Sequence, residues 1–225
     1  MVRYPVAVGD GSAPTERPVA AGPRPDHLVT FYEHAGYLAA SVRPFLLEGL
    51  RRGETVLVVA TPEHREAFAR ALADHGHDVA CSRRAGRYVE LDAATTLAEL
   101  VADDQLPAAR FEERITRPLT ALAHTPPGLR VYGEMVALLW QRGQLGLALE
   151  LEDRWNALLE GAAFPLFCGY PLTAFDTPEA NARFHDVCAR HSRVTTDSYS
   201  TLAEPAAATG GVVMLTAGEP GGSAN

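Results

Sequence analysis

The stretch ETVLVVATPE, residues 54–63, decides the fold. Its first seven residues are β-branched and almost wholly apolar, which is typical of a strand that is covered on both faces. Thr61, Pro62 and Glu63 then supply an N-cap, a proline at the first turn and an acidic residue, which is the usual start of a helix. A strand followed at once by a helix is the repeating unit of a parallel α/β sheet.

The same alternation extends on both sides of this stretch. HLVTFY at 27–32 predicts a first strand, and apolar residues then recur at helical spacing as far as Leu50, with a kink or restart expected at Pro44. Further strands are predicted at 78–81, 87–91, 129–132 and 164–169, and further helices near 93–101, 108–124, 134–141, 144–160 and 178–190. We therefore predict an α/β fold, a three-layer α/β/α sandwich with a mostly parallel sheet.

The two ends of the chain differ in composition from its middle. Residues 1–26 are rich in Pro, Gly, Ala and Val without a repeating apolar face, and residues 203–225 are similar apart from the apolar run 212–215. We expect a disordered N-terminal arm at 1–26, one folded domain at 27–202 and a flexible C-terminal tail at 203–225. The three cysteines show no CxxC spacing and no signal-like segment begins the chain, which favours a cytoplasmic protein with reduced thiols.

The charged residues exclude several classes of function. All 20 cationic residues are Arg, against 28 Asp and Glu, which gives a net charge of −8. Without Lys there is no Walker A phosphate loop, no pyridoxal Schiff base and no protein-kinase lysine. An acidic chain with no Arg-rich stripe is not expected to bind nucleic acid directly, and no apolar run approaches the roughly 20 residues that a membrane span needs.

A candidate ligand site follows from the predicted parallel sheet. Ligands of such sheets bind beyond the carboxyl ends of the strands, where loops and helix N-termini converge. Four segments lie at predicted strand ends, namely Tyr32-Glu33-His34, Thr61-Pro62, Gly133-Glu134-Met135 and Tyr170-Pro171. We take as candidate ligand-binding residues Tyr32, Glu33, Thr61, Glu134, Met135 and Tyr170.

Glu134 is the most informative of these residues. Gly133 lets the backbone turn, so the carboxylate falls in the first turn of the following helix, where the helix dipole favours an ionised acid. The alternative is that Glu134 only favours the helix start. Glu33 also follows a strand, so the two acids could face each other and act as acid and base or hold a cation. No residue is assigned a catalytic role.

We expect neither a nucleotide cofactor nor a metal. Where a phosphate-binding loop would read GxxxxGK[ST], this chain has YEHAGYLAAS at 32–41, with one Gly, no Lys and an acid that would repel phosphate. His75 and His77 lie in a predicted turn, and His185 and His191 are six residues apart, so no metal-ligand spacing is present.

Other conspicuous side chains are interpreted as core. Phe184, Cys188 and His191 form a stripe on the last predicted helix, and the alternative of a Cys188–His191 nucleophile has no support from a lowered thiol pKa or exposure. Cys168 lies in an apolar strand, and Trp155 shares one helix face with leucines.

The chain resembles the MEDS domain, the methanogen and methylotroph sensory domain that also occurs in a dichloromethane-responsive repressor. The resemblance runs in order from His27 to about Tyr199. It is carried by the stretches HLVTFYEHAGYL, GETVLVVATPEHREAF, VYGEMVALLW, ALELEDRWNALL, FCGYPLTAF and FHDVCARHSRV. The matching positions are His27, Phe31, Tyr32, Glu33, Gly133, Glu134, Met135, Trp155, Asn156, Cys168, Tyr170, Pro171 and His191, and no catalytic role comes with them.

This resemblance implies a RecA/KaiC-like fold with a degenerate phosphate loop and a role in sensing small molecules such as hydrocarbon derivatives. Family members are often joined to a histidine kinase, an anti-sigma module or a DNA-binding domain. We therefore expect a non-catalytic module that binds a small organic ligand and signals through a separate histidine kinase, anti-sigma factor or transcription regulator.

Two other hypotheses stay open. The chain could be a hydrolase or transferase that uses Glu33 or Glu134 as acid or base, or a ligand-free interaction module whose acidic surface binds a basic partner.

Overall fold

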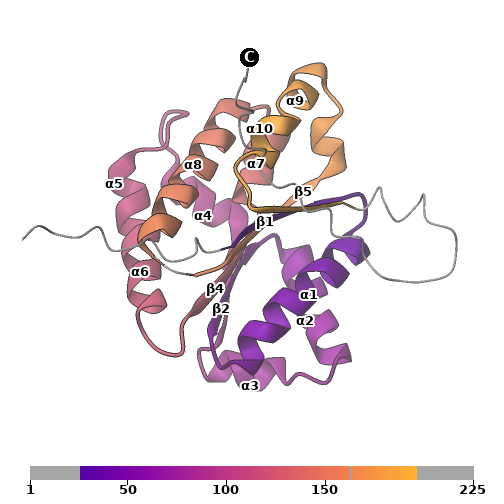
Figure 1. Ribbon diagram of the computed structural model, residues 1–225, viewed down its shortest axis with the longest axis vertical. Helices are drawn as coiled ribbons and strands as arrows, with labels where there is room; N and C mark the ends of the chain where they lie inside the picture. Colours follow the sequence, from indigo (N-terminus) through magenta and orange to yellow (C-terminus); the bar gives the residue numbers. More distant parts are fainter. Residues whose placement is uncertain (1–25, 163, 197–225) are drawn as a thin grey trace, which may run out of the picture.

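The computed structural model describes residues 26–162 and 164–196, and a six-stranded sheet runs through the middle of this part of the chain (Figure 1). The strand order is β3-β2-β4-β5-β1-β6, and each neighbouring pair is parallel. The strands are β1 (His27–Tyr32), β2 (Thr55–Ala60), β3 (Tyr88–Asp92), β4 (Leu129–Gly133), β5 (Leu166–Pro171) and β6 (Arg193–Thr196).

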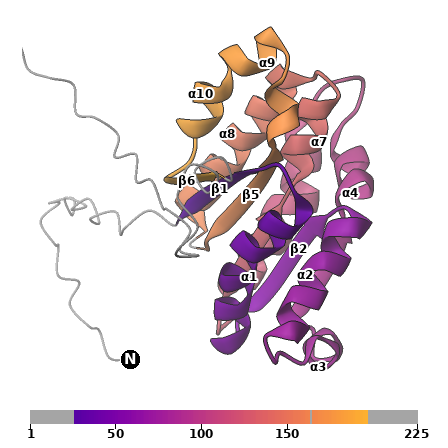
Figure 2. The same cartoon turned by 90° about the vertical axis from the view of Figure 1, so that its right-hand side faces the viewer.

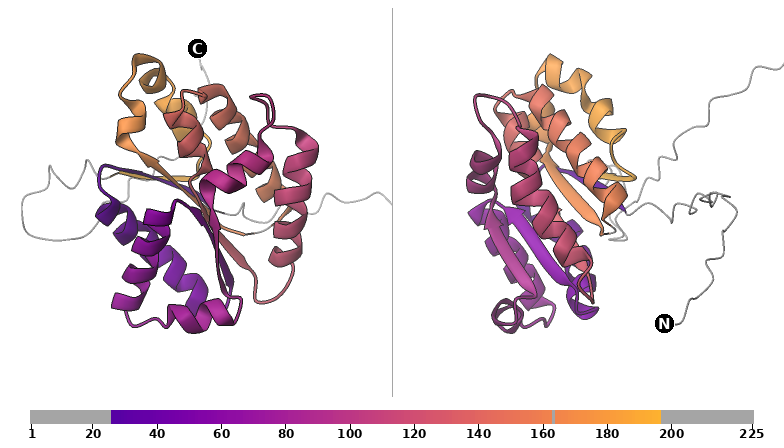
Figure 3. Two further views of the ribbon diagram at one scale, coloured as in Figure 1. Left: turned by 180° about the vertical axis from the view of Figure 1, so that it is seen from behind. Right: turned by 90° about the vertical axis from the view of Figure 1, so that its left-hand side faces the viewer.

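Helices cover both faces of the sheet, as Figure 3 shows from behind, so the predicted three-layer α/β/α sandwich is confirmed. One face, here called the α1 face, carries α1 (Ala35–Arg51), α2 (Pro62–Asp74) and α3 (Val79–Arg84). The opposite α8 face carries α4 (Ala93–Leu100), α5 (Ala108–Phe111), the π-helix η1 (Glu112–Thr116), α6 (Arg117–Ala123), α7 (Met135–Gln141), α8 (Leu145–Gly161), the 3-10 helix η2 (Leu172–Phe175), α9 (Pro178–Ala182) and α10 (Phe184–Cys188).

Strand β2 shows why the sheet is covered on both sides. Side chains alternate along a strand, so Val56 and Val58 pack in the core of the α1 face while Leu57 and Val59 pack in the core of the α8 face. All four are at most 6% exposed. An apolar run without polar alternation is therefore what this central strand requires.

The start of α2 forms as the sequence predicts. Thr61 is the N-cap, its side-chain oxygen accepts a hydrogen bond from the His64 backbone N–H at 3.4 Å, and Pro62 occupies the first turn. Because β2 ends at Ala60, the first turn of α2 stands directly at the carboxyl end of the sheet.

Several local predictions are corrected. The strand predicted at 78–81 is wrong: Asp78 caps a helix there by accepting from the Cys81 N–H at 2.8 Å, and α3 follows. The restart expected at Pro44 does not occur, since α1 is one helix with Pro44 inside it. The helix predicted over 178–190 is divided into α9 and α10 at Arg183. Strand β6, which was not predicted, pairs with β1 (Figure 2).

The terminal predictions fall largely beyond this part of the chain. The arm at 1–26 is described only at Asp26, the tail at 203–225 and the run 212–215 lie outside the described residues, and the domain at 27–202 is described as far as Thr196. Within these ranges no helix has both the length and the apolar character needed to cross a bilayer.

Candidate functional site

The carboxyl ends of β2 and β4 are joined by Glu134. Its backbone N–H donates to the Val59 carbonyl at 3.1 Å, and its side-chain Oε1 accepts from the Thr61 backbone N–H. The side chain is almost wholly buried. A buried carboxylate needs several polar partners, and the first of them is therefore the loop that begins α2.

The second partner of Glu134 is His64, in the first turn of α2. His64 Nδ1 lies 2.7 Å from Glu134 Oε2, and the imidazole keeps 13% of its side-chain surface exposed. Burial lowers the pKa of His64, but the hydrogen bond and the negative charge of Glu134 outweigh burial, so the net pKa is raised above 6.5. The pair is thus a carboxylate and an imidazole that favours its charged form.

Aromatic rings surround this pair. The Tyr132 hydroxyl donates to Glu134 Oε2 at 3.2 Å, and the Tyr32 ring meets the His64 ring edge-on with centroids 5.6 Å apart. Phe68 packs against Tyr132 with centroids 4.8 Å apart. Burial and then the charge of Glu134 raise the pKa of Tyr32, so its hydroxyl stays protonated.

We call Tyr32, Thr61, His64, Tyr132 and Glu134 the Glu134 cluster. It combines an ion pair, a phenol and a helix N-terminus against an apolar wall, close to solvent at His64. Such an arrangement can hold the polar end of a small ligand, and its carboxylate–imidazole pair can also transfer a proton.

Strand β5 leaves room for this cluster through Gly169. A Cβ added to Gly169 would lie 2.5 Å from the Tyr132 hydroxyl, so a side chain and Tyr132 cannot share this space. Because Tyr132 is fully buried, it has no alternative position on the surface. Gly169 is therefore needed for the close approach of Tyr132 to β5.

The six residues expected at the ligand site divide into groups. Tyr32, Thr61 and Glu134 come together in the Glu134 cluster. Glu33 is exposed at the end of β1, and β5 lies between β1 and β4, so the loops of Glu33 and Glu134 are not neighbours in the sheet.

The two remaining residues face away from the Glu134 cluster. Met135 and Tyr170 are buried in the core of the α8 face. The Tyr170 hydroxyl donates to Glu152 Oε1 at 2.8 Å, so its polar atom belongs to a different set of side chains.

The sequence reasoning missed His64 and Tyr132. The position of His64, three residues after the N-cap Thr61, was a usable signal, because a side chain in the first turn of a helix faces the carboxyl edge of the sheet. Tyr132 had a weaker signal, the alternation of β4 that places it opposite to Val131.

A second set of polar side chains lies under α8. His27, Glu152, Cys168 and His191, which we call the Glu152 cluster, have one potential ligand atom each within 4.8 Å of all the others. Burial holds the pKa of His27 and of His191 down to about 4 and raises the pKa of Glu152. Cys168 is buried, as predicted.

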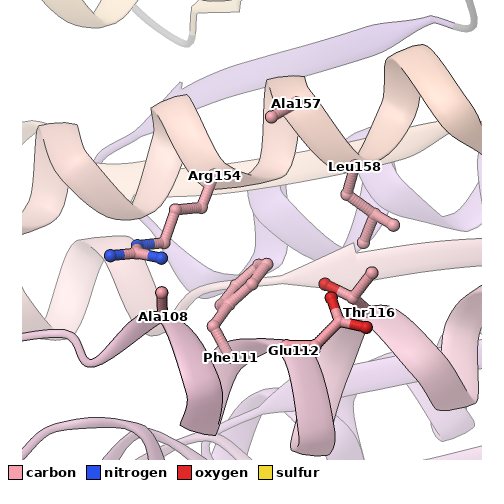
Figure 4. A pocket seen from close by; sticks show the side chains of 7 residues that line it. All are labelled: Ala108, Phe111, Glu112, Thr116, Arg154, Ala157 and Leu158. Carbon is pink, nitrogen blue, oxygen red and sulfur yellow. The ribbon is translucent and has the colours of Figure 1, made fainter.

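The described residues also form an open groove of about 320 Å³ between the α5–η1 segment and α8 (Figure 4). Figure 4 shows Arg154 on one side of Phe111 and the Glu112 carboxylate on the other, and Arg154 is itself paired with Glu150 at 2.7 Å. The residues that line the groove are Ala108, Phe111, Glu112, Thr116, Arg154, Ala157 and Leu158, so it belongs to neither cluster.

Comparison with known proteins identifies similar sequences and folds. A family model described as MEDS, MEthanogen/methylotroph, DcmR Sensory domain, matches residues 26–191. Among solved structures, a KaiC-like protein from the hyperthermophilic archaeon Pyrococcus horikoshii OT3 superposes with a TM-score of 0.51 at 15% identity, over 77% of this chain and 73% of that one. No curated protein matches. The structural likeness confirms a RecA/KaiC-like fold and, at this identity, nothing further.

Proposed function

The chain belongs to the MEDS family of sensory domains, and we propose that it senses a small organic molecule at the Glu134 cluster. In this proposal the molecule changes the surface that a separate signalling protein recognises, such as a histidine kinase, an anti-sigma factor or a transcription regulator. The proposal rests on one observation above all, the buried Glu134–His64 pair at 2.7 Å at the carboxyl edge of a parallel sheet.

The composition of the Glu134 cluster supports a ligand with an apolar body and one polar group. The Tyr32 ring supplies an apolar surface, while the Tyr32 hydroxyl and the His64 imidazole supply hydrogen-bonding groups. Small ligand sites generally combine an apolar lining with a few such polar groups. Short alcohols, carboxylates and halogenated hydrocarbons have the matching chemistry.

A signal requires that the ligand prefers one of two conformations, since equal affinity for both shifts nothing. Glu134 links the end of β4 to the N-terminus of α2 through Thr61 and His64. A ligand that competes for either bond would move the start of α2 relative to the sheet. We therefore expect the partner protein to contact helix α2 and to respond to this movement.

Native mass spectrometry of the full chain tests the proposal. We expect a stoichiometric added mass, relative to the denatured chain, after incubation with the ligand classes named above. Glu134→Gln should abolish it, because the amide cannot hold the charged imidazole in place. Glu150→Gln is the matched control, because Glu150 is an exposed carboxylate on α8. If Glu134→Gln still shows the added mass, the ligand does not bind at the Glu134 cluster.

The same Glu134–His64 pair also favours a second function, acid–base catalysis in a hydrolase or transferase. Turnover of an ester, phosphate or nucleotide substrate that is lost in both His64→Gln and Glu134→Gln, and kept in Glu150→Gln, would support an enzyme. Uniform inactivity of the wild type across these substrates would refute it.

A further inference from the structure

The Glu152 cluster brings four different segments to one point beneath α8. His27 begins β1, Glu152 lies on α8, Cys168 lies in β5, and His191 precedes β6. The side chains of His27, Glu152 and His191 are at most 4% exposed, and Cys168 is 1% exposed. None of these groups takes part in the Glu134 cluster.

Hydrogen bonds on the far side of each imidazole fix its tautomer. His191 Nδ1 lies 2.7 Å from the Val187 carbonyl oxygen, which can only accept, so Nδ1 carries the proton. Asn156 donates its amide N–H to the Arg190 carbonyl at 3.1 Å, so its Oδ1 faces His27 Nδ1 at 2.9 Å and that nitrogen is also the donor. In the neutral rings, which burial favours, both Nε2 atoms therefore offer lone pairs to the cluster.

These lone pairs face the carboxyl group of Glu152, which in its ionised form can only accept hydrogen bonds. His27 Nε2 lies 3.4 Å from Glu152 Oε2, and His191 Nε2 lies 3.5 Å from Glu152 Oε1. His191 Nε2 is buried and has no hydrogen-bond partner among the residues that the structure describes. A cation held between the two nitrogen lone pairs, the carboxylate and the sulfur would satisfy all four groups at once.

The two Nε2–carboxylate distances favour a metal ion over a proton shared between nitrogen and oxygen. A proton between nitrogen and oxygen gives a separation of about 2.7–3.2 Å, shorter than both Nε2–carboxylate distances. Tetrahedral ligands at about 2.0–2.3 Å from an ion lie about 3.3–3.8 Å from one another. The Cys168 Sγ to His27 Nε2 distance of 3.5 Å fits this range, and the Cys168 Sγ to Glu152 Oε2 distance of 4.0 Å is beyond it. All four ligand atoms lie within 4.8 Å of one another, so binding would draw them closer together.

We propose that His27, Glu152, Cys168 and His191 form a closed Zn²⁺ site, with Nε2 of each imidazole, one carboxylate oxygen and the thiolate as its four ligands. Zn²⁺ accepts this mixture of nitrogen, oxygen and sulfur in tetrahedral geometry. With a thiolate and a carboxylate as ligands the charge of the site is zero, which suits its burial.

The groups around the cluster are those that usually orient metal ligands. Metal-binding histidines commonly donate their other N–H to a carbonyl or amide oxygen, as His191 does to Val187 and His27 does to Asn156. The carboxylate is held by the Tyr170 hydroxyl at 2.8 Å. Complete burial leaves no position for a substrate, so the site is structural and links β1, β5, α8 and the segment before β6.

Cobalt substitution tests the proposal on the full, untagged chain. The protein is stripped with a chelator under reducing conditions and titrated with Co²⁺. We expect about one Co²⁺ per chain, with the visible bands of tetrahedral Co²⁺ and a thiolate-to-cobalt charge-transfer band. Cys168→Ser should lose the charge-transfer band. Cys188→Ser should keep it, because this half-buried thiol lies outside the cluster.

Any of three results would contradict the proposed metal site. They are binding of less than one Co²⁺ per chain by the wild type, a charge-transfer band that Cys168→Ser keeps, and a charge-transfer band that Cys188→Ser loses. If Cys168→Ser does not fold, X-ray absorption at the zinc edge of the Zn²⁺-loaded wild type identifies the ligands instead. We expect one sulfur and three nitrogen or oxygen atoms in the zinc coordination shell, and a shell without sulfur would contradict the proposal.

Discussion

Replacing Gly169 by Ala should disturb the Glu134 cluster from the neighbouring strand β5, on the same face of the sheet. The added Cβ would stand 2.5 Å from the Tyr132 hydroxyl and 3.3 Å from Leu38 Cδ1. Tyr132 cannot easily move away, because its ring is fully buried against Phe68 and Phe167 and its hydroxyl is bonded to Glu134.

The size of the effect follows from these contacts. An ordinary contact needs about 3.4 Å, so the hydroxyl must move by about 0.9 Å, and overpacking a dense core by such an amount costs about 1–3 kcal/mol. The same movement weakens the 3.2 Å hydrogen bond to a buried carboxylate, which adds about 1.5–3 kcal/mol. We expect Gly169→Ala to lower the free energy of unfolding by about 2.5–6 kcal/mol.

Urea unfolding of single and double variants measures this cost. Tyr132→Phe removes the hydroxyl, so in that background Gly169→Ala should cost about 1 kcal/mol or less, a strong coupling in a double-mutant cycle. Gly36→Ala is the control, because a Cβ there meets no atom of the described part of the chain within 4 Å, and it should change stability by no more than about 0.5 kcal/mol. Equal costs of Gly169→Ala with and without the Tyr132 hydroxyl would refute the reasoning.

Three further predictions concern the two clusters. Glu134 raises the pKa of His64 above 6.5, so the ion pair stabilises the fold most while His64 is charged. The free energy of unfolding of the wild type relative to His64→Gln should therefore be greatest below about pH 6.5 and should fall as the pH rises through the raised pKa. Urea unfolding from acid to alkaline pH measures this difference, and the absence of such a trend would contradict the ion pair. Tyr170→Phe removes a donor from buried Glu152 and should cost about 1.5–3 kcal/mol by the same assay, so a loss below about 0.5 kcal/mol would contradict that bond. Thr61→Ala removes the N-cap of α2 and should lower the melting temperature, in line with a loss of about 1 kcal/mol.

The central strands could be predicted because their own residues determine them. β2 is apolar at nearly every position, and such a run is stable only where two layers cover it. Residues 78–81 have no such length, and the cap from Asp78 to the Cys81 N–H makes a short helix the better solution there. β6 has four residues and gains its hydrogen bonds from β1, which lies more than 160 residues earlier in the chain.

The candidate site was predictable only in part for a related reason. Strand ends can be read from a sequence, and Tyr32, Thr61 and Glu134 do meet at the carboxyl edge. Which face of the sheet a side chain points to depends on its exact position in the strand, because neighbouring residues alternate between the faces. Tyr170 was expected at the ligand site but points into the core of the α8 face.

The Glu152 cluster shows the limit of reasoning from spacing. Its members come from positions 27, 152, 168 and 191, and no local motif connects them. Their meeting depends on the strand order, which places β5 beside β1, and on Glu152 of α8 reaching side chains of both strands. Metal-ligand patterns within one segment, the usual signal in a sequence, are absent for that reason.

The sensing proposal is tested most directly by protein-observed NMR at the Thr61 amide, whose N–H donates to Glu134. The full chain is titrated with short alcohols, carboxylates and halogenated hydrocarbons while the amide and imidazole resonances are followed. We predict that one of these compounds shifts the Thr61 and His64 signals saturably, and that Glu134→Gln abolishes the shifts while Glu150→Gln does not. Shifts centred on the Phe111 groove that persist in Glu134→Gln, or no saturable shift with any compound, would contradict a ligand site at the Glu134 cluster.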